Sequence, residues 1–466
     1  MSSAAVPSGR RLRPGLESAA GRTVATRDRR RRLSHPRLLP TVTAGAASRT
    51  SRSGLGPAAG SLFAFVVLGL PDGMLGVAWP SLRAGFGQPL GSLGELLLAS
   101  LAGYLAITIT AGAALRTLGT SALLMAAAVA AAAGAALIAA APAWGVVVPG
   151  ALLLGTAGGA LDAALNTVVS LNRRPTLMNL LHASYGVGAA LGPLLVTAAL
   201  AAGSAWRGAY AALAILEVVL LAVWMASRRS IPPVPRGHDR EKPAPPEVPL
   251  PAEPPAASRS SAPRPALPAP PPAPSLRPPD WRRLLLPLSL ALFFCYTGLE
   301  ASVGSWAASY LRGSLGLSAA LSGVAVFLYW TGLTAGRLAA AGLGPRVSAQ
   351  TAAWMGASVS LAGAVLVWLG ASAWVTVAAL PVIGLGLGPI FPALMTLTPS
   401  RLGRSLAVHA VGWQLAAAGI GGAGLSALLG VVLQAAGLSR LGPALTVLAA
   451  LVLILDLVLE RADRRA

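Results

Sequence analysis

Charged residues are scarce in this chain. They make up 11% of its 466 residues, and only 15 residues are Asp or Glu, whereas a soluble globular protein is about a quarter charged. Hydrophobic residues reach 55% and are grouped in long blocks, and the mean hydropathy is +0.68. A run of about 20 apolar residues spans a bilayer as a helix, because a helix satisfies its own backbone hydrogen bonds. The composition therefore predicts a protein whose solvent is lipid.

Cysteine pairs, metal-site motifs and ATP-binding motifs are also lacking. The one cysteine, Cys295, lies in an apolar stretch and is interpreted as a small core residue. The chain can therefore form neither an internal disulfide nor a zinc site of paired cysteines. It contains no Gly-x-x-x-x-Gly-Lys-Ser/Thr loop and no His-Glu-x-x-His motif. We expect neither an enzyme nor a resident cofactor, so any active process must draw on a gradient, most simply a proton gradient.

Acidic residues are outnumbered by basic ones, and the net charge is +21. The basic residues lie mostly in two polar tracts and in short loops, so the charge does not predict binding to nucleic acid. The first tract, 1–58, contains four consecutive arginines and is predicted to be a disordered cytoplasmic tail; the alternative is that the protein begins near Val42. The second tract, 228–282, is rich in proline and is predicted to be an extended linker.

Apolar blocks alternate with short polar breaks in the rest of the chain. They predict an all-α polytopic membrane protein with twelve spans. Six spans form an N-terminal bundle (59–227), six form a C-terminal bundle (283–460), and a short tail follows (461–466). The predicted spans are 60–82, 92–113, 118–140, 145–169, 177–202, 206–226, 284–311, 317–341, 349–370, 373–397, 405–433 and 439–460.

The distribution of Lys and Arg predicts the orientation. If the N-terminus is cytoplasmic, the basic residues on the other side of the membrane are Arg83, Arg207, Arg312 and Arg440, and the rest of the 36 are inside. The excess inside persists when both long tracts are left out. By the positive-inside rule, both termini and the linker are cytoplasmic, and we expect the plasma (inner) membrane.

Three short motifs recur in the same order in the two predicted bundles. Each match is weak alone in so alanine-rich a chain, but their shared order favours a duplicated six-helix unit. Carriers built from such repeats bind their solute at the midplane, between the repeats. The matched positions are Thr110–Gly112 with Thr334–Gly336, His182 with His409, and Asp72 and Trp79 with Glu300 and Trp306.

Ionisable side chains inside predicted spans are candidates for function, because they are costly in lipid. Asp72 follows Pro71 in a glycine-rich stretch where the helix can break, and a carboxyl group there suits proton coupling. Asp162 and Asn166 are four residues apart, so they share a helical face and suit a hydroxylated solute or a proton. The alternative for these three is a hydrogen bond that holds helices together.

The fifth span adds Asn179, His182 and Tyr185 to the predicted site. Asn179 and His182 share a helical face, and a histidine can carry a proton near neutral pH. The alternative for His182 is a structural histidine near the cytoplasmic end of the span.

In the second bundle, Glu300, Trp330 and Gln414 are predicted to contribute to the solute or proton site. An indole ring can stack on a sugar face, although packing is its common role. Gln414 is expected to face the cavity. Arg337 lies near the inner end of its span, so we expect it to form a gating or loop-anchoring ion pair. Structural roles are predicted for Glu95, Glu217 and Asp456.

Together these stretches resemble the fucose–galactose–glucose proton symporter branch of the major facilitator superfamily, over about residues 60–227 and 283–460. The resemblance rests on Asp72, the Gly-x-x-Asp-x-x-x-Asn run ending at Asn166, the run from Leu181 to Pro193, Glu300 with Trp306, the run from Trp330 to Arg337, and the run from Gly384 to Pro392.

The resemblance implies alternating access by rocking of two halves. It also implies that the carboxylates of the first and fourth spans, here Asp72 and Asp162, serve proton coupling and sugar recognition. The usual basic loop between the second and third spans is reduced here to residues 115–119 with a single arginine. We therefore expect the inner gate to pair Arg337, Arg173 or Arg174 with an acid.

The expected function is secondary transport by a proton-coupled importer of a sugar or similar solute. We expect a monomer whose partners are a small-molecule solute and membrane lipids. The alternatives are an exporter of drugs or metabolites, and a non-transporting sensor or scaffold that acts through its tail and linker. Deleting residues 1–58 separates the last alternative, because a carrier should keep its transport.

Overall fold

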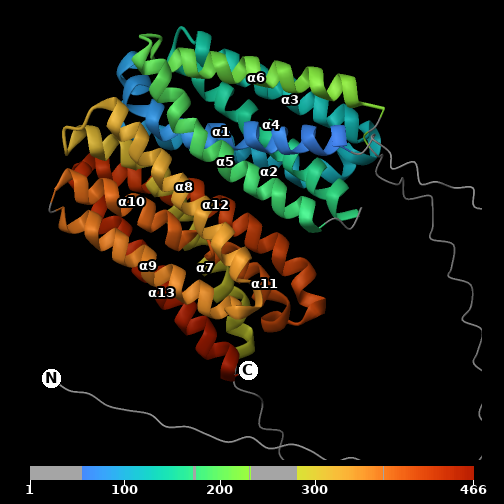
Figure 1. Ribbon diagram of the computed structural model, residues 1–466, viewed down its shortest axis with the longest axis vertical. Coiled ribbons are helices and arrows are strands. Elements are labelled where there is room, and N and C mark those ends of the chain that lie inside the picture. The colour runs from blue at the N-terminus through green and yellow to red at the C-terminus, as the bar shows by residue number, and fades with distance from the viewer. Residues whose placement is uncertain (1–54, 172–174, 230, 232–280, 371, 466) are drawn as a thin grey trace, which may run out of the picture. The chain divides into compact units, whose positions relative to one another are not determined.

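The computed structural model describes residues 55–171, 175–229, 231, 281–370 and 372–465. Within these residues, twelve helical segments are long and apolar enough to cross a membrane, as the sequence predicted. Nearly all of the predicted N-terminal tail and linker lie outside the described residues, and α1 begins at Leu55, within the range predicted as tail. The long helices are α1 (Leu55–Phe86), α2 (Leu93–Leu118), α3 (Thr120–Ala140), α4 (Trp144–Leu171), α5 (Pro175–Ala201), α6 (Ala205–Ser227), α7 (Trp281–Gly313), α8 (Ala319–Leu343), α9 (Ala349–Leu369), α10 (Ala373–Leu387), α11 (Ile390–Leu402), α12 (Arg404–Ala436) and α13 (Leu441–Arg465) (Figure 1).

Proline affects two of these spans differently. Pro71 lies inside α1, which continues through it as one helix, so the break expected beside Asp72 does not occur. The tenth span, predicted as one segment, consists of two helices, α10 and α11, separated by Gly388 and Pro389. Proline has no N–H and clashes with the preceding turn, so α11 starts as a new helix.

The two halves repeat the same helix pairings. In the first half, α1 packs against α5, α2 against α4, and α3 against α4 and α6. In the second half, α7 packs against α12, α8 against α10, and α9 against α10 and α13. The two groups appear as the blue-to-green and yellow-to-red halves of Figure 1. This is the architecture of two pseudo-symmetric six-helix bundles that the sequence predicted.

Glycines allow the central helices to approach closely. A Cβ atom on Gly69 of α1 would lie 2.2 Å from the carbonyl oxygen of Tyr185 on α5, and one on Gly192 of α5 would lie 2.4 Å from that of Leu70. Small residues at helix contacts are a usual solution in membranes, where packing holds helices together. The close contact places Asp72 on α1 directly beside α5.

The two halves are in close contact at one end of their interface. We call the side of the molecule at which α1 and α7 begin and α6 and α13 end the terminal side. On the opposite side, a Cβ on Gly76 of α1 would lie 2.1 Å from the carbonyl oxygen of Gly304 on α7. The N–H of Gly91, before α2, donates to Oε1 of Gln434 on α12 at 2.7 Å. Here the backbones of the two halves are in close contact at Gly76 and Gly304.

The helices α2 and α12 also approach each other near this side. A Cβ on Gly94 of α2 would lie 2.9 Å from the Cβ of Ala427 on α12. The close contacts of α1 with α7 and of α2 with α12 therefore lie toward the side opposite the termini.

Candidate functional site

The carboxyl group of Asp72 is held by a tyrosine from the neighbouring helix. The hydroxyl of Tyr185 on α5 donates a hydrogen bond to Oδ2 of Asp72 on α1. Asp72 is exposed and Tyr185 is half-buried, so the pair borders open space. Two residues that the sequence placed in the site are thus brought together by the close packing of α1 and α5.

A second polar cluster surrounds Asp162 on α4. Asn166 donates from Nδ2 to Oδ1 of Asp162 at 2.7 Å, which is the contact that their spacing predicts. Tyr104 on α2 donates to Oδ2 of Asp162 at 3.0 Å. The Oδ1 atom of Asn166 is buried and has no hydrogen-bond partner among the described residues. The cluster therefore offers an unused acceptor beside a carboxylate.

Tyr104 is a site residue that sequence reasoning missed. It lies in an alanine-rich span after Gly103, where a single tyrosine carries no positional signal. A Cβ on Gly103 would lie 2.2 Å from the carbonyl oxygen of Leu152 on α4, so this glycine is what lets α2 approach α4. Only the paired helices show that Tyr104 faces Asp162.

His182 lies near this cluster, and the side chains of three other predicted site residues lie outside the described part of the structure. The imidazole of His182 is exposed, packs edge-on against Phe65 with ring centroids 5.9 Å apart, and interacts electrostatically with Asp162. Asn179 lies in α5, but its side chain is outside the described part of the structure. Arg173 and Arg174 lie outside the described residues.

Glu300 anchors a polar cluster in the second half. The hydroxyl of Tyr296, one turn earlier on α7, donates to Oε2 of Glu300, and Nη2 of Arg337 on α8 lies 3.4 Å from Oε1. Tyr329 donates to the backbone oxygen of Glu300 at 2.9 Å. The expectation that Arg337 forms an ion pair with an acid is therefore met within the second half, by Glu300.

The two halves differ in how they compensate their central acids. Glu300 interacts electrostatically with Asp72, so the two carboxyl groups lie near one another across the interface. Glu300 forms an ion pair with Arg337. Among the described residues, Asp72 has no ion-pair partner, and its hydrogen bond comes from the neutral hydroxyl of Tyr185. The unpaired carboxylate is the one on α1.

Two predicted site residues of the second half are buried in helix contacts. Gln414 is fully buried; its Nε2 donates to Oγ of Ser289 on α7 at 2.6 Å, and its Oε1 accepts from Oγ1 of Thr398 on α11 at 3.1 Å. The expectation that Gln414 faces the cavity is wrong, because the side chain ties three helices together. Trp330 is 5% exposed and packs against Gly304, so its ring is enclosed at the contact of α7 and α8.

Glu95 illustrates the acids for which a structural role was predicted. Its Oε2 accepts a hydrogen bond from Nε1 of Trp144 at 2.8 Å, at the junction of α2 and α4 on the side opposite the termini. The contact closes the ends of two packed helices and lies away from the central cluster.

Twelve spanning helices, two matched halves and polar groups concentrated where the halves meet define a membrane carrier of the secondary type. The chain belongs to the Major Facilitator Superfamily, whose family model matches residues 61–426. It is a multi-pass membrane transporter and not an enzyme. No curated protein sequence matches the chain.

Solved structures show the same fold at low sequence identity. A D-xylose–proton symporter is 12% identical, with a TM-score of 0.66 over 87% of this chain and 97% of the other. A bacterial homologue of the human lysosomal transporter Spinster, solved in an inward-facing and occupied conformation, is 13% identical, with a TM-score of 0.60 over 89% of this chain and 97% of the other. The predicted superfamily is confirmed, and the sugar-symporter branch stays a prediction.

Proposed function

We propose that the protein is a proton-coupled symporter that imports a sugar or a similar polyhydroxylated solute by alternating access. We place it in the plasma (inner) membrane with both termini in the cytoplasm, as the positive-inside distribution predicts. The observation that carries the proposal is Asp72: an exposed carboxyl group near the meeting point of the halves, with a tyrosine hydroxyl and no cation as its partner among the described residues.

The proton-binding role falls to Asp72. Ionisable groups inside membrane proteins face a cavity and mark ion or proton pathways. Glu300 forms an ion pair with Arg337, whereas Asp72 has no ion-pair partner of its own among the described residues, and its charge repels that of Glu300. Binding a proton at Asp72 removes that repulsion. Protonation therefore favours the approach of the two halves around the solute.

The solute-binding role falls to the cluster at Asp162. A sugar presents hydroxyl groups that both donate and accept hydrogen bonds. Asp162 and the unpartnered Oδ1 of Asn166 accept, and His182 is exposed beside them. The charge distribution places the terminal side in the cytoplasm.

The likeness to a D-xylose–proton symporter supports this choice of solute and driving ion at the level of the fold. The test uses purified protein in liposomes and a panel of labelled sugars, with and without an imposed proton gradient. We expect one sugar to accumulate against its gradient, Asp72→Asn to abolish accumulation while exchange continues, and Asp162→Asn to weaken binding.

Glu95→Gln is the matched control, because it removes a carboxyl group at a helix junction and should leave accumulation unchanged. If no sugar is taken up by protein shown to be folded, the sugar proposal fails and the exporter of drugs or metabolites takes its place. If accumulation survives in Asp72→Asn, the coupling role of Asp72 fails.

A further inference from the structure

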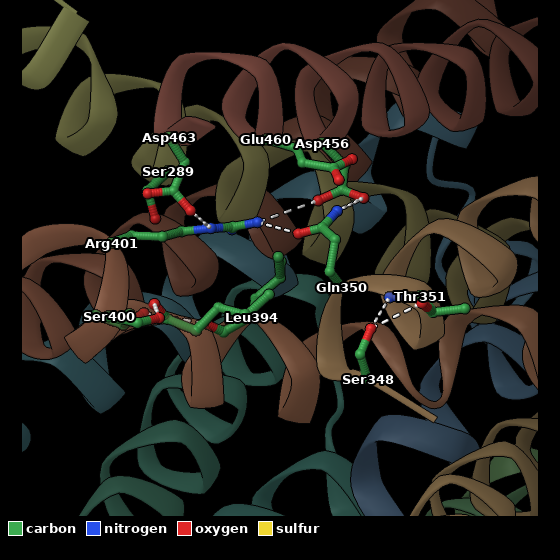
Figure 2. A network of polar contacts seen from close by, with 12 residues as sticks. Ser289, Ser348, Gln350, Thr351, Leu394, Ser400, Arg401, Asp456, Glu460 and Asp463 are labelled. Atoms are coloured by element: carbon green, nitrogen blue, oxygen red, sulfur yellow. Dashed lines mark hydrogen bonds and ion pairs between the residues drawn. The ribbon is translucent and has the colours of Figure 1, made fainter. Parts of the chain in front are cut away.

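A buried arginine outside the central site joins three helices of the second half. Arg401, in the last turn of α11, is 8% exposed. Its guanidinium donates from Nη2 to Oε1 of Gln350 at the start of α9. Its Nη2 lies 4.0 Å from Oδ1 of Asp456, and its Nε lies 3.7 Å from Oδ2 of Asp463, both on α13. Figure 2 shows the arginine side chain extended between these groups.

The partners of Arg401 also contact each other. Gln350 donates from Nε2 to Oδ2 of Asp456 at 3.2 Å, so the amide bridges the guanidinium and the carboxylate (Figure 2). Asp456 is 2% exposed. Charges taken out of water are tolerated when they are paired and hydrogen-bonded. The network therefore fixes the end of α11 against α9 and α13.

The other end of α11 contacts Tyr296, which belongs to the polar cluster around Glu300. The ring of Phe391, the second residue of α11, packs against Phe293 and Tyr296 on α7, with centroids 5.4 and 6.1 Å apart. Tyr296 is the residue whose hydroxyl donates to Glu300. The helix that Arg401 fixes at one end thus forms part of the packing around that tyrosine at the other.

The tyrosine hydroxyl also reaches the break between α10 and α11. The oxygen of Tyr296 lies 3.3 Å from the carbonyl oxygen of Leu387, the last residue of α10. A tyrosine hydroxyl has one proton to donate, so it serves either the Leu387 carbonyl or the Glu300 carboxylate. The position of the helix break therefore influences which group receives that proton.

Pro389 has no N–H to donate, so the hydrogen-bond ladder of the span is interrupted where α11, a helix of 13 residues, begins. We propose that Arg401 is a positioning residue for the polar cluster of Tyr296, Glu300 and Arg337. It holds α11 so that Phe391 and the break at Leu387 keep the hydroxyl of Tyr296 on Glu300, and with it the ion pair of Glu300 and Arg337. The inference assigns Arg401 a role in the transport cycle proposed above.

The test is hydrogen–deuterium exchange of the purified full-length protein, which needs no solute. The variants are Arg401→Gln, Arg401→Lys, and Arg401→Gln combined with Asp456→Asn; the double variant leaves no buried carboxylate unpaired and so keeps the fold. Arg464→Gln is the matched control, because Arg464 forms an ion pair with Glu460 at the exposed end of α13.

We expect exchange to rise several-fold in residues 388–402 and in residues 293–300 for Arg401→Gln and for the double variant. Arg401→Lys should stay near the wild type, and Arg464→Gln should match it. A second expectation is reciprocal: Tyr296→Phe should raise exchange at the start of α11, because coupling between two sites acts in both directions.

Two outcomes overturn the proposal. If exchange rises only at residues 398–402 and not at 293–300, Arg401 acts locally. If it rises equally in both halves, the arginine maintains general stability only. Neither outcome depends on which solute is carried, so failure of the sugar proposal and failure of this inference are separate results.

Discussion

The two halves of the molecule share their helix pairings but not their electrostatics. In the first half, the acids at the centre, Asp72 and Asp162, receive hydrogen bonds from the neutral groups of Tyr185, Tyr104 and Asn166. In the second half, the acids are matched with arginines: Glu300 with Arg337, and Asp456 with Arg401. The two halves thus share their helix packing and differ in the partners of their acids.

The partners of the acids determine how easily each half can change its protonation. A carboxylate paired with an arginine is expensive to protonate or to remove, because the cation is then left without its counter-charge. A carboxyl group that only accepts from neutral donors can exchange a proton without leaving a charge behind. In the proposed mechanism, the first half supplies the carboxyl groups that change protonation, and the second half supplies a fixed arrangement of paired charges.

The largest effect should come from breaking the pair in the second half. Glu300→Gln leaves the half-buried guanidinium of Arg337 without its carboxylate, and we expect about 3 kcal/mol of lost stability. Asp72→Asn removes the equivalent acid of the first half, where no cation is stranded, and should change stability by less than about 1 kcal/mol. Thermal unfolding of the purified variants measures both.

The double variant Glu300→Gln with Arg337→Gln tests the reason for that difference. If charge imbalance causes the loss, the double variant should recover most of the stability of the wild type. An equal loss in Asp72→Asn would show that the two acids are held alike, and the contrast between the halves would disappear.

The second effect concerns the close contact between α1 and α7, which belong to different halves. Gly76→Ala places a methyl carbon 2.1 Å from the backbone oxygen of Gly304, and overpacking of this kind costs about 1–3 kcal/mol. The closed contact on the side opposite the termini should then become the minor state. Gly412→Ala is the control, because its methyl group meets nothing within 4 Å.

The measurement is labelling of a single cysteine placed at Ser305 of α7, which is buried beside Gly76. The native Cys295 is first replaced by serine. We expect the labelling rate to rise about tenfold or more with Gly76→Ala and to stay unchanged with Gly412→Ala. A rate that responds equally to both would mean that the close contact of α1 and α7 does not control closure.

The sequence predicted most of the fold because lipid imposes simple rules. Apolar length and the placement of arginines gave twelve spans and two halves, and the spacing of Asp162 and Asn166 gave their contact. The sequence did not identify Tyr104, because its position opposite Asp162 depends on how α2 and α4 pack. The role of Gln414 was wrong for the same reason: a buried amide and a cavity-facing amide look alike until the neighbouring helix is known. The break at Pro389 was missed because Pro71 and Pro389 carry the same local signal, yet only Pro389 interrupts its helix.

The tyrosine donors of the first half should give a smaller effect. Tyr185→Phe and Tyr104→Phe each remove one hydrogen bond to a carboxylate, worth about 1–3 kcal/mol for a charged acceptor. If Asp72 binds the proton and Asp162 the solute, Tyr185→Phe should shift the pH dependence of uptake, and Tyr104→Phe should raise the KM. Uptake in liposomes at several pH values separates the two. If both variants change the same quantity, the two clusters act as one site.

The smallest effect should come from Gln434, where one half binds the other through a single exposed side chain. Its Oε1 accepts from the N–H of Gly91 at 2.7 Å, and a hydrogen bond of this kind contributes about 0.5–1.5 kcal/mol. Gln434→Ala should therefore raise the labelling of a cysteine at Ser305 several-fold, less than Gly76→Ala does. Gln434→Glu keeps an acceptor oxygen and should stay near the wild type. This order of effects follows if backbone contact between the halves sets the closed state and the amide only adds to it. An effect of Gln434→Ala as large as that of Gly76→Ala would instead make the side chain the main lock between two otherwise independent halves.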